Sequence, residues 1–244
     1  LVAGLMLGCG NAGTTVSSSD FIRIDGQDLV APDGSKFFIK GTNLGNWLNP
    51  EGYMFGFQKT NSARLIDQMF CEMVGPDFTA EFWKMFKDSY VTEKDIEFIA
   101  STGANTIRIP FHYKLFTDED YMGLTSAQDG FKRLDDAIGW CRKYGLYVIL
   151  DMHDAPGGQT GDNIDDSYGY PWLLESEASQ KLFCDIWKKI AQYYKDEPVI
   201  LAYDLINEPI APYFDNVEDL NDLLEPLHKR VTAAIREVDN NHII

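Results

Sequence analysis

Cysteine and basic residues are both scarce in this sequence, and each scarcity excludes a class of function. The 244 residues include only four cysteines, Cys9, Cys71, Cys141 and Cys184, and no two of them stand at a spacing that binds zinc. Only 21 lysines and arginines oppose 38 acidic residues, which gives a formal net charge of −17. Because phosphate binding needs concentrated positive charge, the sequence argues against nucleic-acid partners, and it disfavours polyanionic substrates too. A neutral sugar would be unaffected by this charge.

A hydrophobic run long enough to span a bilayer is also missing, but the N-terminus resembles an export signal. Residues 1–8 are small and apolar and lead directly into Cys9, as at the end of a bacterial lipoprotein signal. We interpret residues 1–8 as the remnant of a signal peptide and expect Cys9 to be lipidated and to tether the protein to a membrane. Residues 9–20 are small and polar and indicate a flexible linker. An ordinary secretory signal is the alternative, and both predict an exported protein, secreted or held at the bacterial envelope.

From residue 21 onward the sequence alternates between apolar strands and amphipathic helices. A hairpin over Phe21 to Val30 and a short strand over Lys36 to Lys40 come first, and two short helices are expected within the aromatic-rich residues 45–90. Strands over 105–109, 146–150 and 199–206 then alternate with helices that begin near Thr92, Asp129 and Ser176. A last helix has an apolar face that runs from Leu220 to Val238, and a further strand starts at 242. This order predicts a parallel sheet covered by helices, either doubly wound or closed into a barrel. No glycine-rich dinucleotide motif follows the first strand, which disfavours the doubly wound alternative.

Polar side chains stand where successive strands end, and the carboxyl ends of parallel strands meet at one edge. The sharpest motif is Tyr203 to Pro209, an apolar strand that ends in Asn207-Glu208. A glycosidase needs a carboxylic acid beside the leaving oxygen, with a pKa raised enough to keep its proton near neutrality. A solvated acid at a loop start is the alternative interpretation of Glu208. The strand-end residues are Arg108, His112, Asp151, His153, Asn207 and Glu208.

Four motifs in this order resemble glycoside hydrolase family 5. They are Lys40 to Leu48, Asn105 to Pro110, Val148 to Gln159 and Asn207 to Pro209, and the third is similar to the exo-β-1,3-glucanase branch. The resemblance covers about residues 21–244. It implies a (β/α)8 barrel, hydrolysis of a β-linked oligo- or polysaccharide with retention of configuration, and no metal or organic cofactor.

The resemblance also implies site residues, position by position. Glu208 matches the acid/base, and Asn207 matches the residue that contacts the sugar 2-hydroxyl. Arg108 matches the arginine that pairs with the nucleophile, and His153 lines the subsite for the terminal sugar. His112 either joins this site or packs in the core. Two further substrate-binding positions, a glutamate and a loop asparagine, match Glu51 and Asn163. Trp47 is a loop aromatic near a strand end, and we expect it either to stack on a sugar face or to pack in the core.

The family's nucleophile, a glutamate near the end of the seventh barrel strand, has no match here. The sequence ends on what looks like the start of a fifth strand, so we expect a barrel truncated after about that strand, a monomer that is inactive alone, and an active full-length parent. A catalytically inactive, surface-bound glycan-binding barrel is the second hypothesis. A metal-dependent lyase or isomerase is the third, but Asp151 and Glu208 alone are too few ligands to hold magnesium well.

Overall fold

A four-stranded parallel sheet forms the centre of the computed structural model, which describes residues 17–123, 127–162 and 164–244. The strand order is β4 (Gly41–Asn43), β5 (Thr106–His112), β6 (Tyr147–Asp154) and β7 (Ile200–Asp204). Ile243 adds an isolated parallel bridge to Ala202. β5 is buried along most of its length. In β6, Val148, Leu150 and Met152 are buried, whereas Tyr147, Ile149 and His153 are partly exposed. The strands have the arrangement of part of a (β/α)8 barrel, as expected.

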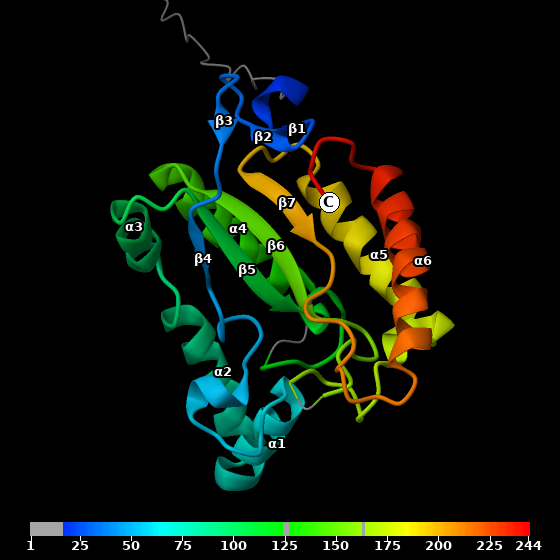
Figure 1. Cartoon of the computed structure of the whole chain (residues 1–244). Coiled ribbons are helices and arrows are strands. Elements are labelled where there is room, and N and C mark those ends of the chain that lie inside the picture. The colour runs from blue at the N-terminus through cyan, green and yellow to red at the C-terminus, as the bar shows by residue number, and fades with distance from the viewer. Residues whose placement is uncertain (1–16, 124–126, 163) are drawn as a thin grey trace, which may run out of the picture.

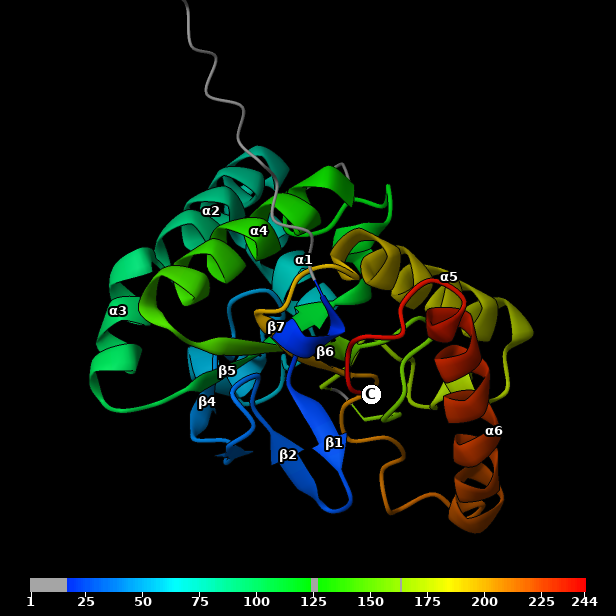
Figure 2. The same ribbon diagram turned by 90° about the horizontal axis from the view of Figure 1, so that it is seen from above.

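Helices cover the outer face of this sheet in an arc, which Figure 2 shows from above. They are α3 (Glu93–Ser101), α4 (Ala127–Tyr144), α5 (Glu177–Tyr194) and α6 (Val217–Arg236). The predicted starts of α3 and α5 are confirmed: Thr92 caps α3 with a capping box to Asp95, and the Ser176 hydroxyl accepts the Ser179 amide of α5. Short 3-10 turns η3 (Tyr113–Phe116) and η4 (Trp172–Leu174) precede α4 and α5.

The long segment after β4 folds beyond the carboxyl ends of the strands, at the lower edge of Figure 1. It contains the 3-10 turn η2 (Gly52–Phe55) and the two predicted helices, α1 (Ala63–Val74) and α2 (Pro76–Ser89). Trp83 is fully buried at the centre of an aromatic cluster, and its indole N–H donates to Asp67 at 2.7 Å. This packing fixes the segment beside the edge of the sheet where polar residues gather.

A small antiparallel sheet covers the opposite, amino end of the strands (Figure 1). It consists of β1 (Arg23–Asp25), β2 (Asp28–Val30) and β3 (Lys36–Phe37). The single strand expected over 36–40 is divided, because Phe37 pairs with Leu29 whereas the main sheet begins only at Gly41. Residues 18–20 form a 3-10 turn, η1 (Ser18–Asp20), which Ser17 caps, so the end of the predicted linker has a defined conformation. The rest of the linker, with Cys9, lies outside the described residues.

Cys141 and Cys184 are buried in α4 and α5 as free thiols, where they pack as small apolar side chains. No helix in the described part of the chain is long and apolar enough to cross a membrane.

Candidate active site

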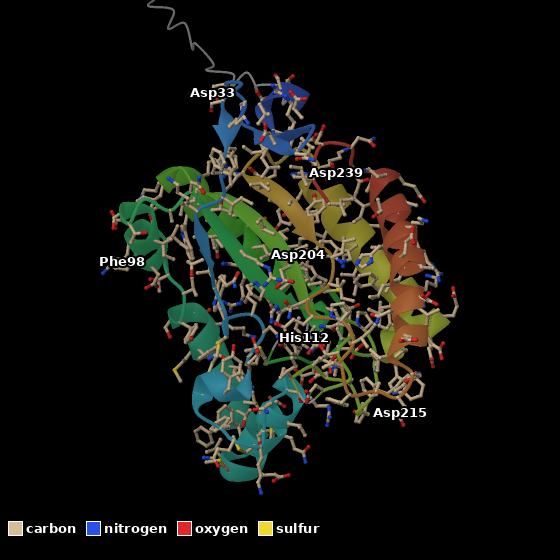
Figure 3. The ribbon with its side chains drawn as sticks, viewed as in Figure 1. Asp33, Phe98, His112, Asp204, Asp215 and Asp239 are labelled. Atoms are coloured by element: carbon tan, nitrogen blue, oxygen red, sulfur yellow. The ribbon has the colours of Figure 1, made fainter. Side chains whose placement is uncertain are left out.

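Arg108 lies at the centre of the polar residues on the carboxyl edge of the sheet. Its Nε donates to Asp204 Oδ2 at 2.8 Å, and ion pairs join its Nη1 to Asp151 Oδ2 at 2.9 Å and its Nη2 to Asp204 Oδ2 at 2.8 Å. Nη2 also donates to Asn207 Oδ1 at 3.0 Å. Asp204 occupies the middle of the structure, where Figure 3 labels it. Side chains from three neighbouring strands therefore meet at the Arg108 guanidinium group, whose planar arrangement of donors suits several carboxylate partners.

Asp151 and His153 follow each other on the inward side of β6. The Asp151 carboxylate is fully buried, and its Oδ2 lies 2.7 Å from His153 Nδ1. Burial raises the pKa of Asp151, although His153 and Arg108 oppose the shift. Burial alone would lower the pKa of His153, but its hydrogen bonds with Asp151 and Glu51 outweigh this and raise the pKa to about 9. The contact between Asp151 and His153 Nδ1 holds the imidazole in one orientation, with Nε2 facing the edge of the sheet.

Glu51 reaches the same histidine from the loop after β4. Its Oε1 lies 3.4 Å from His153 Nε2, and the residue is only 7% exposed. Asn46 builds this loop: it adopts a left-handed conformation with φ of 64°, and its side-chain oxygen accepts the Glu51 amide at 3.0 Å. Asparagine tolerates that conformation better than most residues. The structure therefore unites Glu51 and His153, which are far apart in the sequence.

Asn207 and Glu208 leave the end of β7 toward this group. Because Arg108 donates to Asn207 Oδ1, the amide nitrogen of Asn207 faces His153 Nε2 at 3.3 Å. Glu208 is exposed, with a left-handed φ of 40°. Partial burial raises the pKa of Tyr53, and the negative charges of Glu51 and Glu208 raise it further. We name these residues the strand-end network: Glu51, Arg108, Asp151, His153, Asp204, Asn207 and Glu208.

Trp47 is not part of the strand-end network. It is 2% exposed within the hydrophobic core, and its indole N–H donates to the Lys87 carbonyl at 2.9 Å. The stacking role predicted for Trp47 is therefore wrong, because an enclosed indole offers no face to a sugar. The predicted binding residue Asn163 lies outside the described residues.

His112 is not part of the strand-end network either, because a register shift after Phe111 pairs it with Asp154. Its Nε2 lies 2.9 Å from Asp166 Oδ2 and 3.2 Å from Asp154 Oδ2, all three side chains being buried (Figure 3 labels His112). The three side chains have the composition of a metal site. However, the Lys114 amide donates to His112 Nδ1 at 3.1 Å, so the proton of a neutral ring must sit on Nε2, the atom that a metal would need. A ligating histidine normally donates its second N–H, so these residues do not fit a metal.

The charge of this trio is set by opposing effects. Burial acts to lower the pKa of His112, but the charges and hydrogen bonds of Asp154 and Asp166 outweigh it and raise this pKa to about 9. Burial raises the pKa of Asp154 to about 6. Asp166 has the opposite shift: burial acts to raise its pKa, but hydrogen bonds from His112 and the Arg64 amide lower it to about 2. The trio is therefore a buried, charge-assisted hydrogen-bond network that supports the fold.

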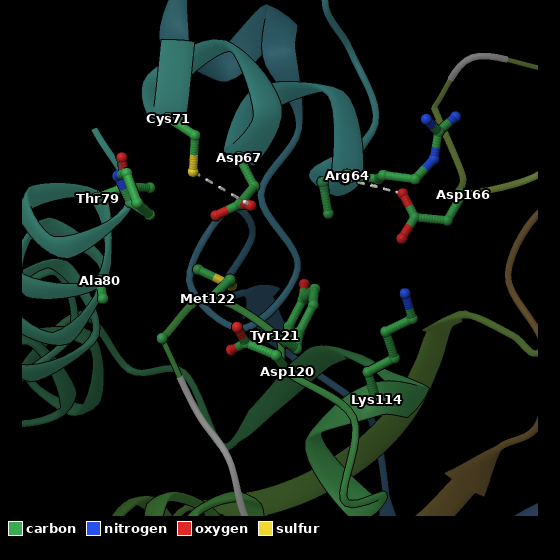
Figure 4. A pocket seen from close by; sticks show the side chains of 13 residues that line it. Arg64, Asp67, Cys71, Thr79, Ala80, Lys114, Asp120, Tyr121, Met122 and Asp166 are labelled. Carbon is green, nitrogen blue, oxygen red and sulfur yellow. Dashed lines mark hydrogen bonds between the residues drawn. The ribbon is translucent and has the colours of Figure 1, made fainter. Parts of the chain in front are cut away.

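A polar cavity of about 150 Å³ lies between α1, α2 and η3, and Asp166 of the trio lines its wall (Figure 4). Its wall carries both signs of charge, from Arg64, Asp67, Lys114 and Asp166. None of its lining residues belongs to the strand-end network, so the cavity is separate from the candidate active site.

Sequence reasoning did not assign a role to Asp204 or Tyr53. Asp204 belongs to the same motif as Glu208, and alternation along β7 could have placed it inward, but its double contact with Arg108 depends on a register shift between β6 and β7. Tyr53 is 61% exposed in η2, and the sequence has no signal that brings this turn toward Glu208.

Comparisons with known proteins identify the family of this chain. The family profile described as Cellulase (glycosyl hydrolase family 5) matches residues 67–244. A β-xylosidase of Phanerodontia chrysosporium is 32% identical over 225 residues, which are 92% of this chain and 45% of the relative. A sporulation-specific glucan 1,3-β-glucosidase of Saccharomyces cerevisiae is 34% identical over 222 residues, 84% of this chain and 48% of the relative.

The solved structures show the same fold. Rutinosidase from Aspergillus niger superposes with a TM-score of 0.63 at 22% identity, over 81% of this chain and 60% of that chain. The chain spans about half the length of the curated relatives it matches. The family profile, the relatives and the fold lead to one conclusion: the chain belongs to glycosyl hydrolase family 5, the cellulase family.

Proposed function

We propose that the whole protein is a retaining β-glycosidase that hydrolyses a β-glucan-type oligo- or polysaccharide, with Glu208 as its acid/base. The observation that carries the proposal is the convergence of Glu51, His153, Arg108 and Asn207 at the carboxyl edge of the sheet, where Asn207 directly precedes Glu208 in the chain. Active sites of barrel enzymes lie at this edge. The membership in family 5 and the relative named a glucan 1,3-β-glucosidase support the substrate class.

Each side chain has a chemical task in this proposal. The Glu208 carboxyl group protonates the leaving oxygen of the glycosidic bond and then removes a proton from the water that completes hydrolysis. Glu51 and His153, 3.4 Å apart, offer an acceptor and a donor to neighbouring hydroxyls of one sugar ring. Asn207 is oriented by Arg108, so its amide nitrogen faces the same space.

Arg108 provides the positive charge next to the reacting centre. It donates hydrogen bonds to Asp204 and Asn207 and forms ion pairs with Asp151 and Asp204. We propose that the whole protein supplies a second carboxylate, the nucleophile, beside this guanidinium group. A nearby cation keeps such a carboxylate ionised.

The test is activity of the full-length protein on laminarin, carboxymethylcellulose, mannan and aryl β-glucosides. We expect turnover of a β-glucan, and a loss of about 10²- to 10⁴-fold for Glu208→Gln. Glu225→Gln is the matched control, since Glu225 is an exposed glutamate of α6 paired with Lys229, and its rate should be unchanged. Full activity of Glu208→Gln would disprove the acid assignment. Binding of a glucan without turnover would favour a catalytically inactive glycan-binding barrel.

We also propose that the protein acts outside the cytoplasm, held at a membrane by lipidated Cys9. The support is the sequence pattern alone: the apolar residues 1–8 lead into this cysteine. In the native host, Cys9→Ser should move the full-length protein from the membrane fraction to the soluble fraction. Unchanged membrane association would contradict the tether.

A further inference from the structure

The turn that carries Glu208 is strained. Glu208 and Ile210 both have left-handed backbones, with φ of 40° and 63°, on either side of Pro209. Residues other than glycine adopt this conformation at a cost in free energy, and they keep it only where the surroundings enforce it. The enforcing contacts come from the loop after β6, not from β7 itself.

The Gln159 carboxamide joins the ends of two strands. It is 1% exposed, and its Nε2 donates to the His153 carbonyl at 2.7 Å and to the Asn207 carbonyl at 3.0 Å. Its Oε1 accepts the Ala155 amide at 3.0 Å. Every hydrogen-bonding group of this side chain except one acceptor lone pair is therefore used, and the side chain fixes the end of β6 relative to the end of β7.

The backbone of Gln159 and Thr160 then pairs with the strained turn. The Gln159 carbonyl accepts the Ile210 amide at 2.9 Å, and the Thr160 carbonyl accepts the Ala211 amide at 2.8 Å. The Thr160 hydroxyl donates to the Glu208 carbonyl at 3.2 Å, so it holds the backbone of the acid itself.

The loop is in turn anchored from behind. The Thr160 amide donates to Asp165 Oδ2 at 2.7 Å, and Asp165 is buried. Gly158 passes so close to Ser167 that a Cβ atom would lie 2.3 Å from the Ser167 side chain. The loop therefore has little freedom to shift, and a rigid support is what a catalytic group requires.

We propose that Gln159 and Thr160 are positioning residues that set the place of the Glu208 carboxyl group relative to the leaving oxygen of the substrate. This inference rests on the proposed function, because it assumes that Glu208 is the acid. Neither residue needs to touch the substrate: both act through the backbone of Asn207 and Glu208.

The test compares leaving groups in the full-length protein. A good leaving group such as 2,4-dinitrophenolate departs without a proton, whereas phenolate or a sugar needs the acid in place. For Thr160→Val, which keeps the shape but loses the hydroxyl, and for Gln159→Glu, we expect kcat/KM for phenyl β-glucoside to fall about 10²-fold. For the 2,4-dinitrophenyl glucoside it should fall less than about 5-fold. Thr160→Ser restores the hydroxyl and should restore the rate.

Gln180→Glu is the matched control, because Gln180 also donates to a backbone carbonyl, that of Leu174 at 2.8 Å, away from the site. It should leave both substrates unaffected. An equal loss on both substrates, or no loss for Thr160→Val, would overturn the positioning role. Glu208→Gln is measured in parallel, and it should show the same dependence on the leaving group, more steeply. If Glu208→Gln showed no dependence on the leaving group while Thr160→Val did, the assignment of Glu208 as the acid would fail. The failure of the acid assignment can therefore be told apart from the failure of the positioning role. If Gln159→Glu does not fold, the Thr160 pair alone decides.

Discussion

Asp151→Asn should reveal how the buried carboxylate controls His153. One oxygen of Asp151 serves both Arg108, at 2.9 Å, and His153, at 2.7 Å, in a position with no solvent exposure. Two unit charges about 4 Å apart interact by about 4 kcal/mol at the effective dielectric constant of a protein, which corresponds to about 3 pKa units. Glu51 remains near the ring, so we expect the pKa of His153 to fall by about 2 units from its present value of about 9.

The same substitution should lower stability, because Arg108 and His153 lose a buried partner. We expect a loss of about 3 kcal/mol in the free energy of unfolding. The sign of the pH dependence follows from the raised pKa of His153. Its contribution is fully present below the unfolded value of about 6.5 and is lost as the pH rises through about 9. The difference between the parent and the variant should therefore shrink from pH 6 to pH 10, leaving the part due to Arg108.

The assay combines NMR titration of the histidine Cε1–H signals with urea unfolding at several pH values. Asp185→Asn is the control, because Asp185 forms an exposed pair with Lys181 one helical turn away, and it should change stability by less than about 0.5 kcal/mol. A His153 pKa in Asp151→Asn within about 0.5 unit of the parent value would refute the reasoning.

Three further substitutions test the fold around the site. Tyr203→Phe removes the hydroxyl that donates to buried Asp239 at 2.7 Å and should cost about 1–2 kcal/mol in urea unfolding. Trp47→Phe should cost about 1–3 kcal/mol and leave the KM of the full-length protein unchanged, because Trp47 lies in the core. Thr92→Ala removes the capping box of α3 and should lower the unfolding free energy by about 1 kcal/mol.

Each of these has a clear counter-result. Tyr193→Phe removes an exposed hydroxyl bonded to Asp135. If it lowered the free energy of unfolding as much as Tyr203→Phe, burial of the Tyr203 hydroxyl would add nothing to the strength of its hydrogen bond. A Trp47→Phe protein with normal stability and a raised KM would restore the stacking role. An unchanged unfolding free energy for Thr92→Ala would mean that α3 is held by its packing alone.

The sequence predicts most of the fold because its signals are local. The apolar runs of β5, β6 and β7, the Thr92 and Ser176 caps and the apolar face of α6 each fix one element without help from distant residues. The strand-end residues Arg108, His153 and Asn207 were found for the same reason: parallel strands end at one edge, wherever the helices pack.

What the sequence could not predict depends on long-range geometry. The register shift at Phe111 turns His112 away from the site, and only the paired strand determines it. Trp47 is a residue type that often stacks on sugars, yet here it is buried against α2, whose Lys87 carbonyl accepts its indole N–H from forty residues later in the chain. Glu208 and Ile210 have left-handed backbones, but neither is a glycine, so the sequence does not mark them. The contacts that enforce these backbones come from the distant Gln159 loop.

The most direct test of Glu208 as the proton donor is azide rescue of the full-length Glu208→Ala protein. With the acid removed, a 2,4-dinitrophenyl β-glucoside should still form the glycosyl-enzyme intermediate, and azide, which needs no general base, should attack it. We expect the turnover rate to rise with azide concentration and the product to be the β-glycosyl azide. No rescue by azide, or an α-glycosyl azide product, would contradict a retaining mechanism with Glu208 as acid/base.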